Sequence, residues 1–328
     1  MTAGSTIAGT AGLLGRQLLF VTGKGGVGKT TLAAALGLLA ASRGQRALVC
    51  ETEPRGALSA AYECGPTGFE PLEISSRLYA MSMDTEASLR EYLKLHLKVP
   101  TVGRIGPIAR AFDFVATAAP GVREILTVGK LCYEVREGHF DLVVVDASAT
   151  GHIVGELAAP VGINELVRVG AVRAQTRWML DILSDPARTG VVLVATPEET
   201  PVTEAVELAS RLEADTGVHL AAVVANRVLP ELFGRSEEAI FDALSTQAGR
   251  RHLSAALAPA PSGELDAVLD AARLAMRVRR SGAEHLGRLA SALSPEVPLV
   301  HLPYLFGRSH GPRAIRQIAD TLAEELGE

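Results

Sequence analysis

The chain has 328 residues, enough for one large α/β domain or two small ones. Its net charge of −5 provides no bulk attraction to nucleic acid, so we expect no nucleic-acid partner. The three scattered cysteines (Cys50, Cys64 and Cys132) include no C-x-x-C pair and no disulfide framework, which predicts a reducing, cytoplasmic location and no structural zinc.

Residues 1–16 are expected to form a flexible extension. Thr2–Gly15 is rich in Ala, Gly, Ser and Thr, and it lacks the basic start that is typical of a signal peptide. No uninterrupted apolar run approaches the ~18 residues that a membrane-spanning helix needs. We therefore expect residues 17–328 to form a single domain.

The central feature is an apolar strand that leads into a glycine-rich loop. Leu18–Val21 is apolar, residues 23–30 read Gly-Lys-Gly-Gly-Val-Gly-Lys-Thr, and Leu32–Ala41 is helical in pattern. A G-x-x-x-x-G-K-[ST] loop between strand and helix binds nucleotide phosphates through its backbone N–H groups and the helix N-terminus. Lys29 is predicted to reach the β- and γ-phosphates, and the Thr30 hydroxyl to lie on Mg²⁺. The predicted nucleotide contacts from this loop are Gly23, Lys24, Gly25, Gly26, Val27, Gly28, Lys29, Thr30 and Thr31.

The rest of the chain alternates apolar strands with helical patterns. Strands are predicted at 46–53, 78–84, 140–146, 191–196, 220–226 and 297–302, with a loop-like stretch at 54–78. Helices are predicted at 85–98, 103–117, 121–137, 153–184, 200–215, 236–250, 262–292 and 310–327. This alternation predicts an α/β fold of the P-loop NTPase type: a doubly wound, mostly parallel sheet with helices on both faces and a helical insertion at about 84–137.

Because ligands of such sheets lie at the carboxyl ends of the strands, further polar strand ends are expected at the phosphates. Asp146 follows four apolar strand residues and is predicted, with Thr30, to hold Mg²⁺ through water. The backbone at Thr150–Gly151 is predicted to sense the γ-phosphate. For His152, a hydrogen bond within this segment and a simple turn cap are equally compatible with the pattern.

Lys24 is a residue that an ordinary phosphate-binding loop does not require. Its presence makes the loop similar to the deviant Walker A motif of the ArsA-like ATPases, a family with arsenite-pump, tail-anchored-protein targeting, septum-site and plasmid-partition members. In that family the extra lysine reaches the nucleotide of a partner subunit. The resemblance implies ATP or ADP with Mg²⁺ as cofactors, a dimer, and a catalytic role for Lys24.

Two later segments resemble the switches of the same family. Residues 51–59 read E-T-E-P-R-G-A-L-S beside the family's D/S-T-D-P-A-H-x-L-S, and residues 146–152 read D-A-S-A-T-G-H beside D-T-A-P-T-G-H. The resemblance implies that Glu53 orients the attacking water and that Asn226 reads adenine. It also implies that Pro303 and Leu305 belong to an adenine-side loop.

The departures from the family pattern leave two functions open. Glu53 replaces an aspartate, which displaces the carboxylate by roughly 1–1.5 Å, Gly56 replaces a histidine, and Ala149 replaces a proline. One hypothesis is a dimeric ATPase that handles a client or a membrane partner. The alternative is a weakly hydrolysing, regulatory subunit in a heterodimer with a related ATPase, as the similarity to paired single-length actinobacterial subunits favours. A partition or positioning ATPase is less favoured, because the C-terminal helix carries acids unsuited to anionic lipid.

The client is not indicated by the sequence. The cysteines are expected to be buried and inert rather than metalloid ligands. The segment at 84–137 contains no methionine for an adaptable groove, and the apolar residues around Trp178 are expected to belong to the core. A transient membrane-protein client or membrane partner, with peripheral attachment through it, is what the family resemblance implies.

Overall fold

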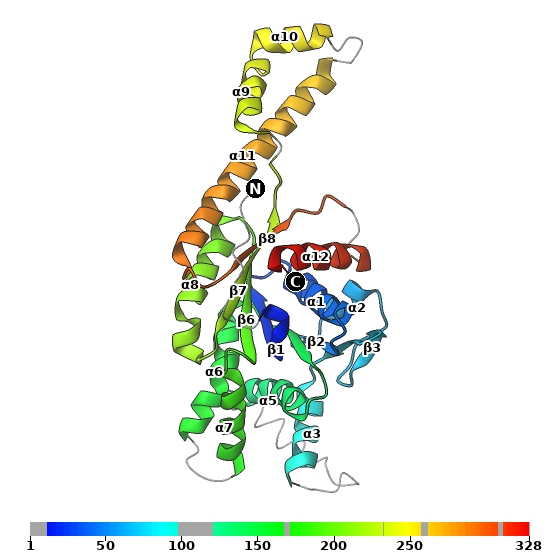
Figure 1. The fold of residues 1–328 in the computed structure, drawn as a ribbon, viewed down its shortest axis with the longest axis vertical. Coiled ribbons are helices and arrows are strands. Elements are labelled where there is room, and N and C mark those ends of the chain that lie inside the picture. The colour runs from blue at the N-terminus through cyan, green and yellow to red at the C-terminus, as the bar shows by residue number, and fades with distance from the viewer. Residues whose placement is uncertain are drawn as a thin grey trace.

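The computed structural model describes residues 12–97, 121–166, 171–231, 233–256, 262–307 and 311–327. Within this part of the chain, eight strands form one sheet in the order β3-β4-β2-β5-β1-β6-β7-β8 (Figure 1). All neighbouring pairs are parallel except β3–β4, which confirms the predicted mostly parallel, doubly wound sheet. The strands are β1 (Leu18–Gly23), β2 (Ala47–Glu51), β3 (Leu72–Ser75), β4 (Leu78–Ser82), β5 (Leu142–Asp146), β6 (Thr189–Ala195), β7 (Leu220–Val228) and β8 (Leu299–Pro303).

The first four residues of the central strands β1 and β5 are all apolar because both faces of the sheet are covered. Along β1, Leu19 and Val21 contribute to one hydrophobic core, whereas Leu18 and Phe20 contribute to the other. The same alternation continues in β5. A strand with this pattern has no polar face, so the sequence shows a continuous apolar run instead of a period of two.

Helices cover each face of the sheet. Helices α1 (Lys29–Ser42), α2 (Ala57–Tyr62) and α12 (Pro312–Leu326) pack on one core. Helices α5 (Val122–Glu137), α6 (Thr150–Leu166), α7 (Ala171–Leu183), α8 (Glu199–Thr216) and the end of α11 (Ser262–Ala292) pack on the other. Gly37 lets α1 approach β2 closely, since a Cβ there would lie 2.3 Å from Val49 Cγ2.

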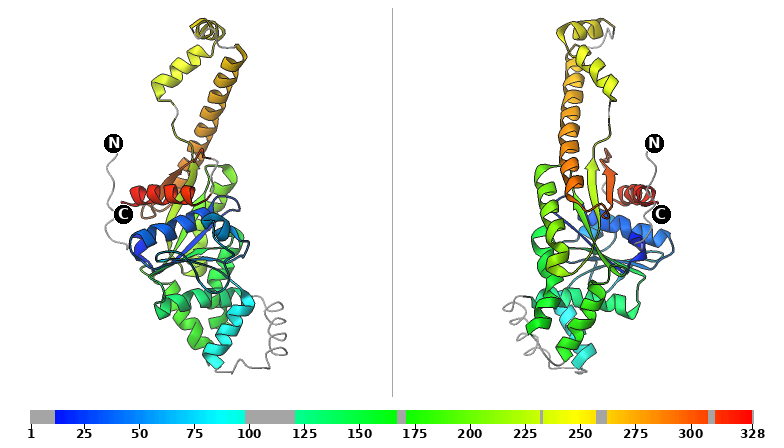
Figure 2. Two further views of the ribbon diagram at one scale, coloured as in Figure 1. Left: turned by 90° about the vertical axis from the view of Figure 1, so that its right-hand side faces the viewer. Right: turned by 60° about the vertical axis from the view of Figure 1, so that its left-hand side comes forward.

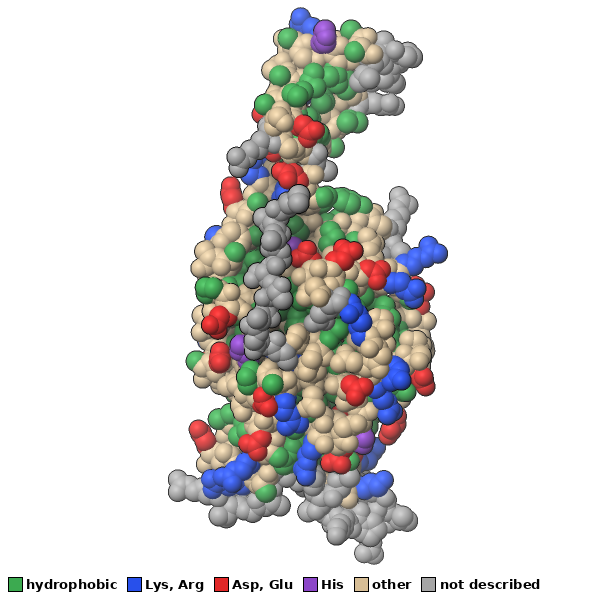
Figure 3. Space-filling model, viewed as in Figure 1, with side chains coloured by type: hydrophobic (Ala, Val, Ile, Leu, Met, Phe, Trp, Pro, Cys, Tyr) green, Lys and Arg blue, Asp and Glu red, His purple; other side chains and the backbone are tan. Residues whose placement is uncertain are grey.

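A helical arm projects from this body. It consists of α9 (Arg235–Leu244), α10 (Gln247–Ala256) and the first half of α11, and it stands clear of the sheet in every view (Figures 1 and 2). Ile240, Val268 and Leu274 on it are more than half exposed. On the face seen in Figure 3, hydrophobic side chains gather on the arm, while acidic and basic side chains are interspersed over the body.

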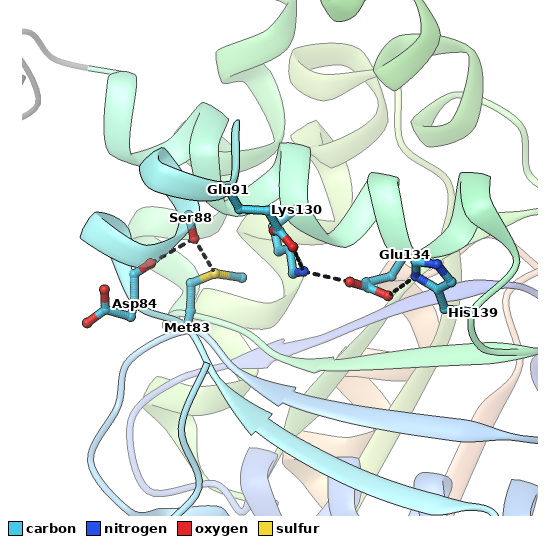
Figure 4. Close-up of polar contacts among 7 residues, drawn as sticks. All are labelled: Met83, Asp84, Ser88, Glu91, Lys130, Glu134 and His139. Atoms are coloured by element: carbon cyan, nitrogen blue, oxygen red, sulfur yellow. Dashed lines mark hydrogen bonds and ion pairs between the residues drawn. The ribbon is translucent and has the colours of Figure 1, made fainter. Parts of the chain in front are cut away.

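A buried cation joins the helices between β4 and β5. Lys130 of α5 lies 2.7 Å from Glu91 of α3 (Thr85–Leu97) and 2.7 Å from Glu134, whose other oxygen meets His139 (Figure 4). The side chains of Lys130 and Glu134 are 7% and 5% exposed. Burial alone lowers the pKa of Lys130, but the hydrogen bonds from Glu134 and Glu91 outweigh burial and raise it. This buried charged cluster therefore links α3 to α5.

Several predicted boundaries need correction. The loop-like stretch at 54–78 contains α2 and the antiparallel strand β3. The helix predicted at 236–250 is two helices, because the Thr246 hydroxyl accepts the N–H of Gly249 at 3.1 Å and starts a new helix. The helix predicted at 153–184 corresponds to α6 and α7, and the one predicted at 103–117 lies outside the described residues.

The burial of apolar residues can be compared with two expectations from the sequence. Leu13 and Leu14, from the stretch expected to be a flexible extension, are buried against the core on the α1 side of the sheet. Met179, Ile182 and Leu183 are buried, which confirms that the apolar residues around Trp178 belong to the core. In the described part of the chain, no helix is both long and apolar enough to span a bilayer.

Candidate nucleotide-binding site

The phosphate-binding loop connects β1 to α1 in a conformation that its glycines permit. Gly28, the N-cap of α1, has a φ of 99°, and a Cβ at this position would lie 2.4 Å from the Asn226 Nδ2 atom. That amide nitrogen donates to the Val27 carbonyl oxygen at 2.8 Å. The side chain of Asn226 therefore supports the loop from the neighbouring strand β7. Gly25 and Gly26, at the tip, are exposed to solvent.

Thr30 and Asp146 meet at the start of α1 and the end of β5. The Thr30 hydroxyl donates to Asp146 Oδ2 at 2.5 Å, while the buried Oδ1 has no partner among the described residues. Burial raises the pKa of Asp146 to about 6, although the Thr30 hydrogen bond and the charge of Lys29 lower it in part. A buried carboxylate oxygen without a donor beside a threonine hydroxyl is suited to a hydrated divalent cation.

Lys29, the first residue of α1, interacts electrostatically with two carboxylates, those of Asp146 and Glu53. Burial lowers its pKa, and the charges of Asp146 and Glu53 act in the opposite direction. An ammonium group partly withdrawn from water at a helix N-terminus is favourably placed to bind phosphate oxygens. Lys29, Thr30 and Asp146 thus form one compact cluster, as the spacing of the motif predicted.

Lys24 is held away from this cluster. Its ammonium group lies 2.5 Å from Glu204 Oε1 of α8, and the other Glu204 oxygen accepts the Thr150 hydroxyl at 2.7 Å. The hydrogen bond from Lys24, and then that from Thr150, lowers the pKa of Glu204. Both charged side chains are about one-third exposed, so the pair contributes at most about 1 kcal/mol. Glu204 thereby connects the phosphate-binding loop, through Lys24, to the segment after β5, through Thr150. The ion pair between Lys24 and Glu204 can be broken at little cost.

The segment after β2 is shaped by a buried carboxylate. Glu51, 2% exposed, accepts the N–H groups of Arg55 and Ala57 at 3.0 and 3.1 Å. Glu53 points outward instead: its side chain is 41% exposed and lies 2.7 Å from Arg55. It borders a hollow of about 670 Å³ that His152 and Glu156 also line.

The residues predicted on the adenine side lie together. Asn226, Pro303 and Leu305 line a hollow of about 350 Å³ that reaches Gly28 and Thr31 of the loop. One amide hydrogen of Asn226 is already used by the Val27 carbonyl, and its oxygen accepts the Arg227 N–H at 2.9 Å. The amide has one hydrogen left for a ligand.

The structure also brings in residues that the sequence analysis did not single out. Glu51 could have been noticed as the first of two acids at a strand end, but its backbone partners lie in an irregular turn. Glu204 carries no local signal, because its contact with Lys24 joins positions 180 apart. Of the three cysteines that the sequence analysis expected to be buried, Cys50 and Cys132 are fully buried, whereas Cys64 is only partly buried. Burial raises the pKa of the Cys132 thiol to about 12. No group of three or more metal-ligating side chains occurs in the described ranges.

The doubly wound sheet and the loop between β1 and α1 define the chain as a P-loop ATPase. It belongs to the anion-transporting ATPase family, whose model matches residues 16–180 and 165–241.

Individual relatives agree with this assignment. The chain is 31% identical to the ATPase BagA of Mycobacterium tuberculosis over 264 residues, which are 76% of this chain and 77% of the relative. It is 28% identical to the arsenical pump-driving ATPase of Escherichia coli over 273 residues, 77% of this chain and 45% of that protein. It is also 32% identical over 160 residues to the ATPase ASNA1 homolog 1 of Paramecium tetraurelia, 46% of this chain and 47% of the relative.

Proposed function

We propose that this chain is a Mg·ATP-dependent ATPase subunit whose nucleotide cycle opens and closes a dimer with a related ATPase subunit. The observation that carries the proposal is the buried Asp146 Oδ1 beside Thr30, which has no partner among the described residues. It lies next to a loop whose N–H groups and Lys29 suit phosphates. Such an atom costs free energy unless a ligand satisfies it.

In this proposal each residue has a separate task. Lys29 and the loop amides bind the β- and γ-phosphates, and Thr30 and Asp146 hold Mg²⁺ through water. Mg²⁺, when bound, offsets the negative charge that develops on the phosphates. Glu53 orients the attacking water, and Asn226, Pro303 and Leu305 contact adenine.

Lys24 is proposed to act across the dimer. In the isolated chain it pairs with Glu204, an exchangeable contact that a phosphate carrying more charge can replace. Transfer of Lys24 to the partner's nucleotide would also free Thr150, since both groups share Glu204. Dimer closure and the segment after β5 would therefore respond together to ATP.

A regulatory subunit within a heterodimer is the second candidate. It is supported by Glu53, which has one methylene more than the family's aspartate and pairs with Arg55 at 2.7 Å. A carboxylate displaced by about 1 Å can reduce a rate by about 10²-fold. The partner in that case is a related subunit with the usual aspartate, and the heterodimer is the assembly we favour. We propose that the ATPase cycle acts on a membrane-protein partner or client; the Escherichia coli relative is named as an ATPase that drives an arsenical pump.

The test is steady-state ATP hydrolysis by the purified chain, alone and mixed with its most similar relative from the same genome, beside light scattering with ATP or ADP. If the chain hydrolyses ATP without a partner and Lys24→Ala abolishes this turnover, the functional unit is a homodimer. Turnover that appears only with the relative, or with Glu53→Asp, indicates the regulatory subunit. Lys94→Ala, at an exposed position on α3, is the matched control. If Lys24→Ala retains turnover and ATP-dependent dimerisation as Lys94→Ala does, the role across the dimer is refuted.

A further inference from the structure

The carboxyl end of β7 carries an extra residue beside the phosphate-binding loop. Ala225 pairs with His301 of β8 and Val228 pairs with Pro303, so two residues of β7, Asn226 and Arg227, stand opposite one residue of β8. Bulges of this kind re-aim a side chain and are over-represented next to active sites. The side chain that this one re-aims is that of Arg227.

Arg227 adopts a backbone conformation that favours glycine. Its φ is 60°, and Glu63 and Arg77 are the other non-glycine residues with positive φ in the described part of the chain. Asn226 imposes this conformation: its Oδ1 accepts the Arg227 N–H at 2.9 Å, while its Nδ2 donates to the Val27 carbonyl at 2.8 Å. Arg227 is therefore tied to the loop through a single buried side chain, and the strain is retained where it positions a cation.

Arg227 lines three hollows; one lies against α11, and the other two reach the phosphate-binding loop. Of these two, one of about 350 Å³ is lined by Gly28, Thr31 and Asn226 and corresponds to the proposed adenine side. The other, of about 440 Å³, is lined by Lys24 and the exposed glycines of the loop. Arg227 is exposed, and no ion pair or hydrogen bond holds its guanidinium group among the residues that the structure describes.

We propose that Arg227 is a nucleotide-contacting residue, whose guanidinium group binds the ribose and α-phosphate of the bound nucleotide. The proposal rests on the proposed function, since it assumes that the loop holds a nucleoside di- or triphosphate. In that arrangement the adenosine end occupies the hollow at Asn226, and the β- and γ-phosphates lie at Lys29. The section of nucleotide that passes Arg227 is then the ribose and α-phosphate.

The chemistry of arginine fits this place. A guanidinium group has a planar fork of donors that can bind phosphate and hydroxyl oxygens at once, and it keeps its charge at all relevant pH values. ATP, ADP and AMP share the ribose and α-phosphate, so the contribution of Arg227 is the same for all three. Lys29, in contrast, contributes most to the nucleotides with β- and γ-phosphates.

The test compares Arg227→Gly with Arg77→Gly in the full chain. Both variants relieve a positive φ, but Arg77 lies in the turn between β3 and β4, away from the site. Binding of ADP, ATP and inorganic tripolyphosphate is measured by calorimetry, and thermal unfolding is followed without ligand. We expect Arg227→Gly to unfold at a temperature no lower than the wild type. We also expect the Kd for ADP and ATP to rise by about tenfold, as for a lost charged hydrogen bond. The Kd for tripolyphosphate, which offers a phosphate at the α position but no ribose, should rise by a smaller factor. Arg77→Gly is expected to leave all three Kd values unchanged.

Three outcomes would overturn the proposal. The first is an unchanged Kd for ADP and ATP in Arg227→Gly. The second is an equal loss for tripolyphosphate, which would mean a general effect of positive charge. The third is an equal loss in Arg77→Gly, which would mean an effect of backbone relaxation. The proposed function is tested separately by Lys29→Ala: wild-type protein that binds no nucleotide, or Lys29→Ala that binds like the wild type, contradicts the site itself.

Discussion

Replacing Asp146 by asparagine separates the stability of the fold from the function of the site. The carboxyl pKa of about 6, against an ordinary 3.8, means that ionising Asp146 costs the folded chain about 3 kcal/mol more than the unfolded chain. Asparagine keeps an oxygen for the Thr30 hydroxyl and removes the charge. We therefore expect Asp146→Asn, without Mg²⁺ or nucleotide, to be more stable than the wild type by about 1–3 kcal/mol at pH 7.5.

The sign of the pH dependence follows from the raised pKa. Between about pH 4 and pH 6 the folded chain binds more protons at Asp146 than the unfolded chain does, so the wild type loses stability as the pH rises through this window. The advantage of Asp146→Asn is largest above pH 6 and falls to about half at pH 5. Urea unfolding in EDTA at pH 5 and pH 7.5 measures both values.

The same variant should lose the response to Mg²⁺. Mg·ADP is expected to raise the unfolding temperature of the wild type and to have little effect on Asp146→Asn, because the ligand oxygen has lost its charge. Asp181→Asn, on an exposed position of α7, is the matched control and should change neither measurement. A variant that is less stable than the wild type at pH 7.5, or an advantage that is the same at both pH values, would refute the reasoning.

Three further predictions concern residues that support the site. Glu204→Gln should weaken the ion pair with Lys24 by about 1 kcal/mol or less. ATP-dependent dimerisation, followed by light scattering, should then appear at a two- to fivefold lower protein concentration. No shift relative to the exposed control Glu207→Gln would contradict this prediction. Lys130→Met removes the buried cation beside Glu134 and leaves that carboxylate with the His139 contact alone among the described residues, so it should cost about 3–5 kcal/mol in urea unfolding. A second change, Glu134→Leu, should largely restore the stability; a single variant as stable as the wild type would argue against the buried cluster. Gly28→Ala combines a φ of 99° with a Cβ that meets a side chain at 2.4 Å, and it should lower stability by about 1–3 kcal/mol and abolish ADP binding by calorimetry; retained binding would show that the loop adapts.

Much of the fold and part of the site follow from local sequence pattern. The apolar strand before Gly23, the helix after Lys29 and the apolar run that ends at Asp146 each depend on neighbouring residues, because burial on both faces and the geometry of a helix N-terminus are local constraints. Since parallel strands share a carboxyl edge, these segments also predict that Thr30 and Asp146 meet. The order of the strands in the sheet is consistent with that prediction.

Only the tertiary structure shows which side chains from distant segments contact one another. The pairing of Lys24 with Glu204, the use of Asn226 to support Val27, and the re-aimed Arg227 all depend on contacts between elements far apart in the chain. The direction of the helical arm is of the same kind, because an amphipathic pattern predicts a helix but not the body it packs against or leaves. Local spacing restricts the backbone within a few residues, whereas these contacts appear only when the two cores pack and bring the strand ends together.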